Sequence, residues 1–462
     1  MLTFIHRVFF ITLIAATFIH PISGFSMGKT PPADLTASQE TNKPKPEMSL
    51  SQAFDFSLRR SEDIKMKKED ISRTSASFME ASGVAVGDIN FVMTDSFQEP
   101  QKSNSESGGV GGTFTASERR ERKFTLSQPL FQGFRSLGAI LGSGNLKSQR
   151  KEEKAYAVQL LYLDVVHAYY SVLSGEKEII VIKSIQELFK ERIAELKERE
   201  RVGRSRPGEI ATAESRMKSL EADLARAQGA LANSRHIFHF FTGVYPSEVT
   251  LLNEKEPNDI EAPENIMESA LNRSDVEAAE QAMKIARNAV IVAQSDLWPK
   301  ITLDGNQYEK REGFQSGIDW DAVIKFDVPL FKGGTTASEI KKAVVDYKKA
   351  KLTYQKTKRE AELDIKKAFE TWKSANDEWK SLSSAVESSE LNYKLQKEDY
   401  ERSLVSNLDV LQALETLLST RQQTNQAEYR ARESYWALKI ATGFSPENLI
   451  EPKPTSVEEE KP

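Results

Sequence analysis

Glu209 and Asp409 are the two residues in this 462-residue sequence whose type and position suggest a chemical role. They lie 200 residues apart, and each follows a short turn-forming run and precedes a helical stretch. A carboxylate at such a place can cap the first turn of its helix, where the backbone N–H groups have no partner within the helix. Any further role of these two residues depends on the assembly in which the chain takes part.

No other set of residues has the pattern of a catalytic or metal site. The chain has no cysteine, which excludes disulfides, thiolate metal sites, cysteine nucleophiles and a lipid-modified N-terminal cysteine. His236 and His239 lie three residues apart on a predicted helix, but no third ligand accompanies them. No Ser/His/Asp set and no carboxylate pair stands out, so we predict that the protein is not an enzyme and uses no cofactor or metal.

Composition and the N-terminus narrow the class of protein. The net charge of -5 gives no general attraction to nucleic acid, and beyond the N-terminus no run of 18 apolar residues predicts a transmembrane helix. Val8–Ile19 is a short apolar run, preceded by Arg7 and followed by small residues, which is typical of a secretory signal peptide cleaved near Gly24 to Ser26. An uncleaved membrane anchor is the alternative.

The rest of the chain is a duplication. Pro129-Leu-Phe-Gln-Gly133 matches Pro329-Leu-Phe-Lys-Gly333 at an offset of 200, and Thr242-Gly243 matches Thr442-Gly443 at the same offset. We therefore divide the chain into a signal peptide (1–26), a flexible N-terminal segment (27–47), a first repeat (48–245), a linker (246–263), a second repeat (264–449) and a disordered acidic tail (450–462).

Each repeat has the same predicted order: a helix, two strands, a very long helix and a shorter helix. The first repeat is predicted to have helices at 50–82, 137–202 and 208–242, with strands at 88–97 and ending at 131; the second has helices at 264–296, 337–403 and 408–442, with strands at 300–309 and 314–331. The longest helix of each repeat, at 137–202 and 337–403, would measure about 100 Å. Apolar and small residues recur at alternating spacings of three and four in both shorter helices, which predicts coiled-coil hairpins with tight tips.

The strands alternate between an apolar and a polar face. In the last strand the apolar positions are Ile318, Trp320, Ala322, Ile324, Phe326 and Val328, and charged residues lie between most of them. Such a strand suits a membrane, with the listed residues facing lipid, and a soluble sheet packed on the helices is the alternative. Because an open sheet edge is costly in lipid, insertion predicts oligomerisation: three chains would supply twelve strands, and two would supply eight.

This pattern resembles the TolC family of outer-membrane efflux proteins. The similarity rests on the duplicated Pro-Leu-Phe-x-Gly, on Leu297-Trp-Pro299, on the tip at Val202-Gly203, on the segment Tyr400–Leu411 and on the closing Thr-Gly pairs, and it covers about Leu50 to Leu449. The resemblance implies a mainly α fold with a small β part, in which duplicated helical hairpins and four membrane strands per chain close as a trimeric channel. It implies a passive conduit from periplasm to exterior that docks a periplasmic adaptor (membrane fusion) protein and an inner-membrane pump or ABC exporter, in contact with outer-membrane lipid.

The resemblance also implies roles for residues at the tips. Tyr400 matches the tyrosine of a closing network, Asp409 matches an acidic ring position, and Glu209 takes the equivalent place in the first hairpin. Three copies of Asp409 at a constriction would focus negative potential on passing ions, so the resemblance predicts a pore that prefers cations. A role limited to capping the helices is the alternative. Val405 and Gln412 depart from the family pattern, which has arginine and aspartate there, and Arg402 is the substitute we consider. The residues expected to contact the adaptor are Val202, Gly203, Ser205, Arg206, Leu404, Val405, Ser406 and Asn407.

Two other classes of protein remain open on the sequence. A periplasmic adaptor also carries long hairpins, although the duplication argues against it, and a coiled-coil structural protein accounts for the helices but not for the strands. We expect a location in the outer membrane of a Gram-negative-type cell, without lipidation. The cargo, the cognate pump and the cognate adaptor are not encoded in any pattern that we recognise.

Overall fold

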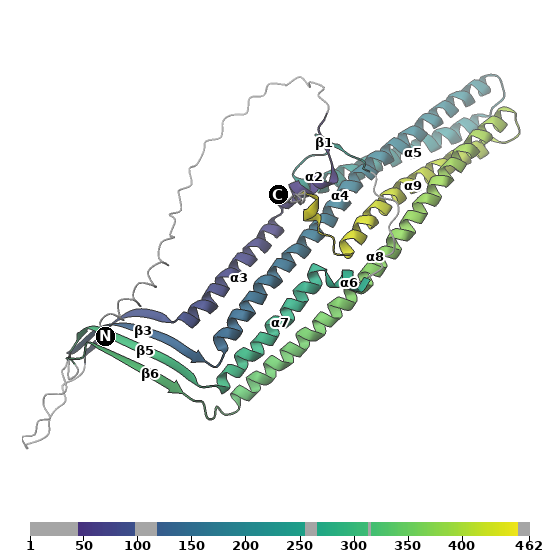
Figure 1. Cartoon of the computed structure of the whole chain (residues 1–462). Coiled ribbons are helices and arrows are strands. Elements are labelled where there is room, and N and C mark those ends of the chain that lie inside the picture. Colours follow the sequence, from purple (N-terminus) through teal and green to yellow (C-terminus); the bar gives the residue numbers. More distant parts are fainter. Residues whose placement is uncertain (1–44, 98–117, 255–265, 313–315, 451–462) are drawn as a thin grey trace, which may run out of the picture. The chain divides into compact units, whose positions relative to one another are not determined.

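The computed structural model describes residues 45–97, 118–254, 266–312 and 316–450, and it is mainly helical with a small group of strands (Figure 1). The first half contains β1 (Glu47–Met48), α2 (Leu50–Arg60), α3 (Glu62–Val86), β2 (Asp88–Phe97), β3 (Glu118–Gln132), α4 (Arg135–Arg201), α5 (Pro207–Thr242) and β4 (Thr250–Leu251). The second half contains α6 (Ile266–Leu271), α7 (Ser274–Gln294), the 3-10 turn η2 (Ser295–Leu297), β5 (Lys300–Arg311), β6 (Trp320–Asp327), α8 (Thr335–Glu401), α9 (Asn407–Ala441) and η3 (Pro446–Leu449).

The two long helices, α4 and α8, have 67 residues each and begin and end within two residues of their predicted bounds. Unusual backbone conformations also recur at the repeat offset. Positive φ angles occur at Gly133, Gly203 and Gly243 and again at Gly333, Ser403 and Gly443. The two halves therefore use the same turns at matching places, as the repeat predicts. The predicted signal peptide and nearly all of the acidic tail lie outside the described residues.

The predicted first helix of each half is divided. Instead of one helix over 50–82, α2 ends and α3 begins at Ser61, whose side chain accepts a hydrogen bond from the backbone N–H of Ile64 at 3.3 Å. The second half breaks between α6 and α7 at Asn272 and Arg273, not running unbroken over 264–296. The sequence did not reveal these breaks because a single capping residue can end a helix without changing the spacing of the apolar residues on either side.

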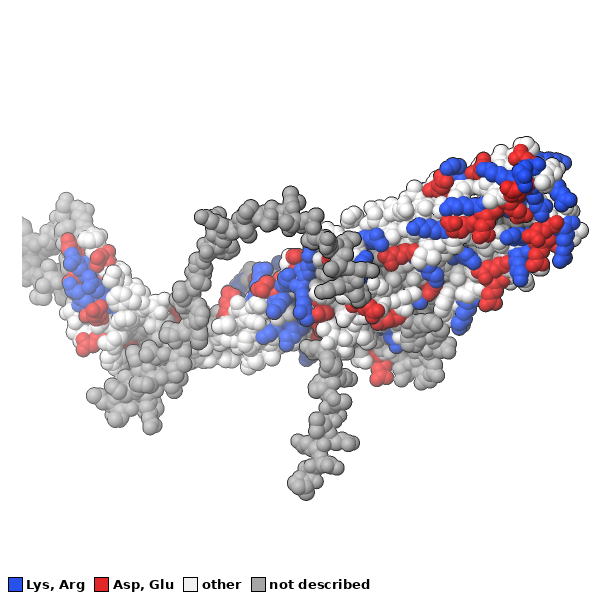
Figure 2. Space-filling model, turned by 90° about the horizontal axis from the view of Figure 1, so that it is seen from above, with Lys and Arg blue, Asp and Glu red and all other residues white. Residues whose placement is uncertain are grey.

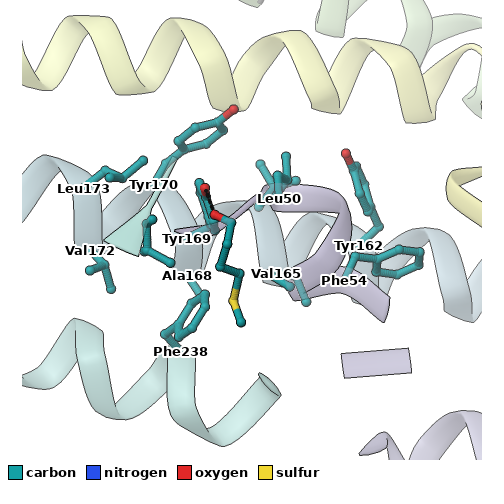
Figure 3. Close-up of a cluster of buried hydrophobic side chains, with 14 of the residues drawn as sticks. Leu50, Phe54, Tyr162, Val165, Ala168, Tyr169, Tyr170, Val172, Leu173 and Phe238 are labelled. Carbon is teal, nitrogen blue, oxygen red and sulfur yellow. Dashed lines mark hydrogen bonds between the residues drawn. The ribbon is translucent and has the colours of Figure 1, made fainter. Parts of the chain in front are cut away.

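Residues predicted as flexible segment and as linker meet in a short parallel pair of strands. Glu47–Met48 pairs with Thr250–Leu251, and the Tyr169 hydroxyl lies 2.9 Å from the Met48 carbonyl oxygen and 2.7 Å from that of Leu252. Beneath this pair, Figure 3 shows side chains of α2, α4 and α5 converging on one buried cluster, which includes Leu50, Phe54, Tyr162, Val165, Tyr169, Val172 and Phe238. The cluster joins the helix before the sheet to the root of the first hairpin.

The four remaining strands form one antiparallel sheet in the order β2-β3-β5-β6. The two halves meet at its centre, where β3 pairs with β5 and Ser127 lies opposite Asp304. The last strand is shorter than predicted, so Ile318 and Val328 lie beside β6 and not within it. Pro329 has no N–H with which to continue the ladder, and Gly317 lies in a turn before the strand, which accounts for both ends.

Among the described residues, no helix is both long enough and apolar enough to cross a membrane.

Gly133 and Gly333 provide a matched test of the junction between strand and long helix. A Cβ at Gly133 would meet the Trp298 Cβ at 2.7 Å and the Ser295 carbonyl oxygen at a still shorter distance, whereas one at Gly333 meets nothing within 4 Å. Both sites have positive φ, which costs a non-glycine residue about 1–2 kcal/mol, and a forced shift in a packed region adds about 1–3 kcal/mol. We therefore expect Gly133→Ala to lower the free energy of unfolding by about 2–5 kcal/mol and Gly333→Ala by about 1–2 kcal/mol. Chemical denaturation of the monomeric protein followed by circular dichroism measures both, and equal losses in the monomer would contradict this packing.

Candidate functional site

The tips of the two hairpins have the same backbone but different side chains. In the first, Gly203 has φ 73° and Arg204 N–H donates to the Arg199 carbonyl at 2.7 Å; in the second, Ser403 has φ 63° and Leu404 N–H donates to the Asp399 carbonyl at 2.9 Å. Glycine adopts this left-handed conformation without steric cost, whereas in serine the Cβ makes it less stable. Apolar side chains are exposed at both tips, at Val202 and Leu404, and Figure 2 shows charges of both signs interspersed over this end.

Tyr400 lies at the centre of the contacts between the two hairpins. The ring, at the end of α8, has the guanidinium of Arg192 at 3.8 Å and that of Arg199 at 4.5 Å, both from α4. The Tyr400 hydroxyl donates to Glu209 Oε2 at 3.3 Å, on α5. Burial, and then the nearby Glu209 charge, raise the pKa of Tyr400, so the phenol keeps its proton as a donor. One side chain thus connects three helices.

Arg192 ties the same hairpins together a second time. The residue is 2% exposed, and its Nε donates to Asn407 Oδ1 at 2.9 Å at the start of α9. Its Nη1 donates to Glu195 Oε2 at 2.8 Å. Its Nη2 is buried and has no hydrogen-bond partner among the described residues. A buried guanidinium is expensive unless it is paired, so these contacts hold Asn407, and with it the start of α9, against α4.

Glu209 and Asp409 occupy matching positions but make different contacts. Glu209 Oε2 accepts from Ser205 Oγ at 2.8 Å as well as from Tyr400, so it belongs to the network between the hairpins. Asp409 Oδ2 accepts from Ser406 N–H at 2.8 Å and from Ser406 Oγ at 2.6 Å, which completes a capping box at the start of α9. These bonds from Ser406 lower the pKa of Asp409. Asp409 therefore has the capping role anticipated from the sequence, and its carboxylate remains exposed.

The other residues singled out from the sequence lie around this network and outside it. Arg402 and Gln412 are exposed, and Arg402 makes no ion pair within the described ranges. Val405 packs against the buried cluster at the tips, and Asn407 is buried against Arg192. The residues that remain exposed at the tips are Val202, Gly203, Arg206, Leu404 and Ser406, while Ser205 is half-buried.

Sequence reasoning missed Arg192 and Arg199. They lie seven residues apart near the end of α4, on one helix face, and both reach the Tyr400 ring. A pair of arginines at heptad spacing just before a hairpin tip is the signal available in the sequence, but it points to no partner, because Tyr400 lies about 200 residues further along the chain. The arginines of the network come from the first hairpin, and not from position 402 or 405 of the second.

The sheet is the second candidate site, and its two faces differ throughout. On one face lie Phe91, Phe124, Leu126, Trp320, Ile324 and Phe326, exposed as large apolar side chains; Trp320 is 66% exposed. On the other face, Ser127 Oγ donates to Asp304 at 2.7 Å, Asn306 Nδ2 donates to Asp321 at 2.7 Å, and the Tyr308 hydroxyl donates to Asp321 at 2.8 Å. Four of the six predicted membrane-facing residues, at 320, 322, 324 and 326, share the exposed face within β6.

The sheet is open at both sides in the chain described. Its edge strands are β2 and β6, and each has one neighbour only. Unpaired N–H and C=O groups at an edge recruit further strands unless they are covered. Across the described ranges, no group of three or more His, Asp or Glu side chains has the arrangement needed to hold a metal ion.

Comparisons with known proteins agree on one family. The sequence profile described as "Outer membrane efflux protein" matches residues 265–444. The "Probable outer membrane lipoprotein SilC" of Salmonella typhimurium is 23% identical over 58% of this chain and 60% of its own length, so the match spans less than two thirds of that relative. The "Cation efflux system protein CusC" of Escherichia coli O6:H1 is 20% identical over 79% of this chain and 82% of its own.

A solved structure shows the same fold. The outer membrane protein VceC of Vibrio cholerae superposes with a TM-score of 0.73 at 18% identity, covering 85% of this chain and 96% of that one. The repeated Pro-Leu-Phe-x-Gly junctions, the paired hairpins and the small sheet are thus accompanied by similarity along most of the chain. The chain is thus similar along most of its length to outer-membrane efflux proteins of the TolC family, and residues 265–444 match the profile of such proteins.

Proposed function

We propose that the protein is the outer-membrane channel of a tripartite efflux or type I secretion system. It would act as a passive conduit from periplasm to exterior that docks a periplasmic adaptor and an inner-membrane pump. The observation that carries the proposal is the sheet, whose one face exposes Phe91, Phe124 and Trp320 while the other holds a hydrogen-bonded polar ladder. A soluble sheet buries its apolar face, whereas a strand in a barrel wall turns that face to lipid and its polar face to water.

The contacts between the two halves suggest how copies assemble. At the first junction, Phe131, Phe134 and Trp298 pack edge to face, with ring centroids 5.3 and 5.7 Å apart. At the second, Leu330 and Phe331 are 93% and 86% exposed. The second junction has the same Pro-Leu-Phe-x-Gly sequence and the same positive φ as the first. The first junction packs on Trp298 of the second half, but in the described chain no further half follows on which the second junction could pack. The next copy's first half supplies the equivalent surface, at the end of α3.

The same argument predicts the strand register between copies. β3 and β6 are related by the offset of 200, and β2 and β5 by an offset of 212 that aligns Ile89 with Ile301. Within one chain, Thr125 of β3 lies opposite Asn306 of β5. The residue equivalent to Thr125 in β6 is Lys325, and the residue equivalent to Asn306 in β2 is Thr94. We therefore expect Lys325 of one copy to lie opposite Thr94 of the next. Continued around an axis, this contact closes a ring without a free edge, and we propose a homotrimer of twelve strands, as the family resemblance implies.

The tips are the proposed gate and adaptor contact. Tyr400, Arg192, Asn407 and Glu209 hold the two hairpins of one chain together, and their release would let the second hairpin move away. Asp409 keeps an exposed carboxylate beside this network, and three copies around an axis would favour cations. The exposed Val202 and Leu404 give the adaptor apolar surface, flanked by Gly203, Ser205, Arg206, Val405 and Ser406.

Membrane attachment would rest on the strands alone. SilC is described as a probable lipoprotein, whereas this chain has no cysteine to carry a lipid. We propose that residues 1–26 direct export and are removed, and that neither nucleic acid nor a cofactor takes part. A periplasmic adaptor or a coiled-coil structural protein is the alternative, and neither would be extracted by detergent from the outer membrane as a trimer.

The first prediction tests membrane location and assembly together, in a chain naturally free of cysteine. We expect Lys325→Cys/Thr94→Cys to form disulfides between copies under oxidation, because directly opposed strand residues have Cα atoms within disulfide range. Outer-membrane fractions extracted with detergent should then show covalent dimers and trimers on non-reducing gels. Thr125→Cys/Asn306→Cys, opposed within one chain, is the control and should give no ladder. Recovery wholly in the soluble periplasm would reject the channel, and membrane protein without a ladder would reject the register.

The second prediction concerns the contacts between the hairpins. Arg192→Met should remove the donors to Asn407 and Glu195 and leave their oxygens unpaired, at a cost of about 2–4 kcal/mol to the joined state. We expect at least tenfold more open time in single-channel recordings from planar bilayers, with the trimer retained. Arg402→Met, an exposed arginine outside the network, is the matched control. Equal effects of the two substitutions would show that the network does not gate the channel.

The third prediction concerns ion selectivity at the tips. Asp409→Asn retains a polar side chain able to cap α9 but removes the exposed charge. Reversal potentials in a salt gradient should shift toward lower cation preference, and the shift should shrink at high salt because exposed charges are screened. Asp399→Asn, also near the tip of the second hairpin, controls for a general change in surface charge. An unchanged reversal potential in Asp409→Asn would limit that residue to its capping role.

A further inference from the structure

Three cations converge on a single carboxylate where the sheet meets the long helices. Lys300 Nζ lies 2.9 Å and Arg135 Nη1 3.8 Å from Asp296 Oδ1, and Lys332 Nζ lies 3.3 Å from Asp296 Oδ2. Hydrogen bonds from Lys300 and then Lys332 lower the pKa of Asp296, which keeps it charged. One carboxylate neutralises one of the three cations.

The neighbouring charges do not remove this excess. Asp327 lies opposite Lys300 in the strand register, but no ion pair joins them in the described part of the chain. Lys325, two residues before Asp327 and on the same polar face of β6, adds a fourth cation. Asp304, diagonal to Lys325 on that face, adds a third carboxylate. Four cations thus face three carboxylates, and the remaining positive charge favours the uptake of an anion.

A cavity opens beside two of these cations, Arg135 and Lys300. It has a volume of about 300 Å³ and is lined by Ala81, Val84, Gln132, Arg135, Ser136, Ala139 and Lys300. The Arg135 and Lys300 side chains remain 51% and 33% exposed, so a solute can reach both. Arginine presents parallel N–H donors to an oxyanion, and lysine adds a mobile point charge. Ser136 and Gln132 supply neutral polar groups beside them.

We propose that Arg135, Lys300 and Lys332 form a binding site for a phosphate-type oxyanion, with Asp296 as the internal anion that such a ligand displaces. Lys300 belongs to the polar face of the sheet, in line with Thr302 and Asp304, and not to the apolar face. A solute phosphate in the conduit is therefore the occupant, and a lipid headgroup on the opposite face is not. The location on the conduit wall rests on the proposed function, whereas the binding chemistry does not.

The site would give the conduit regions of opposite sign. Exposed acidic side chains at the tips favour cations, and the cationic cluster at the base of the sheet holds anions or anionic groups of a larger cargo. An oxyanion bound there would replace the contacts between Asp296 and the lysines. Because Lys332 leads into α8 and Arg135 opens α4, the ligand would also link the starts of both long helices.

The test uses the full chain in detergent and inorganic phosphate as the probe. Isothermal titration at neutral pH and constant ionic strength, with chloride as the reference anion, should show phosphate binding to the unaltered protein. Lys300→Gln/Lys332→Gln should bind about tenfold or more weakly, since two charge-assisted contacts are lost. Lys348→Gln, an exposed lysine elsewhere on α8, should bind as the unaltered protein does. Arg135→Gln alone serves if the double variant misfolds, and it should also weaken binding.

Asp296→Asn separates ligand binding from a structural role. Removal of the competing carboxylate should strengthen phosphate binding severalfold, whereas residues needed only for folding would give weaker binding. Unchanged affinity in the lysine or arginine variants, or weaker binding in Asp296→Asn, would overturn the site. If titration confirms the site but the protein fractionates with the soluble periplasm, the channel fails and the anion site stands. If the channel forms and no variant alters phosphate binding, the site alone fails.

Discussion

The sheet and the long helices of the two halves pack together on one side of each half, and the opposite sides are left exposed in a single chain. Most features of the structure follow from this arrangement. β3 pairs with β5, and α4 packs beside α7, so the second strand and long helix of the first half meet the first elements of the second. The equivalent surfaces on the outer sides, α3 with β2 and α8 with β6, have no counterpart within the chain. Exposed edge strands, the exposed Leu330 and Phe331 and the open space around Gly333 are consequences of that single asymmetry.

Duplication preserves backbone more strictly than side chains. Gly203 and Ser403 adopt the same left-handed turn although only glycine does so without strain, which indicates that the hairpin geometry is more tightly constrained than the residue. Glu209 and Asp409 share a position at the start of a helix, yet the first contacts the other hairpin and the second caps its own helix. Two copies of one scaffold have thus taken different tasks, one contributing the arginines of the network and the other the tyrosine.

Sequence patterns predicted the long elements, whose formation depends on many residues together. They missed breaks and contacts that depend on one residue or on residues far apart in the chain. The long helices α4 and α8, each followed by a recognisable turn, were predicted to within two residues of their bounds, and β2 was predicted at its observed bounds. The break at Ser61 depends on one hydroxyl, and the pairing of β1 with β4 depends on residues about 200 apart. Tyr400 was recognised through its family position, but its partners Arg192 and Arg199 lie on another helix, and spacing along the chain carries no information about that contact.

Buried clusters lie at both ends of the hairpins, and their positions bear on the gate proposed at the tips. At their roots, the buried cluster around Phe54, Tyr162 and Phe238 fixes α2, α4 and α5 together. At their tips, Tyr400 and Arg192 join the two hairpins. Between these points lies an open groove of about 720 Å³ bounded by α4, α5 and α9. Polar contacts join α4 and α9 beside it: Asn425 Nδ2 donates to the Ser174 carbonyl at 3.0 Å, and Gln422 Nε2 donates to Glu178 Oε1 at 2.6 Å. Separation at the tip therefore requires release both of the polar contacts of Tyr400 and Arg192 and of the apolar cluster that residues such as Phe189 and Leu414 form across the hairpins. The buried cluster at the roots is a separate one and can stay intact while the tips move.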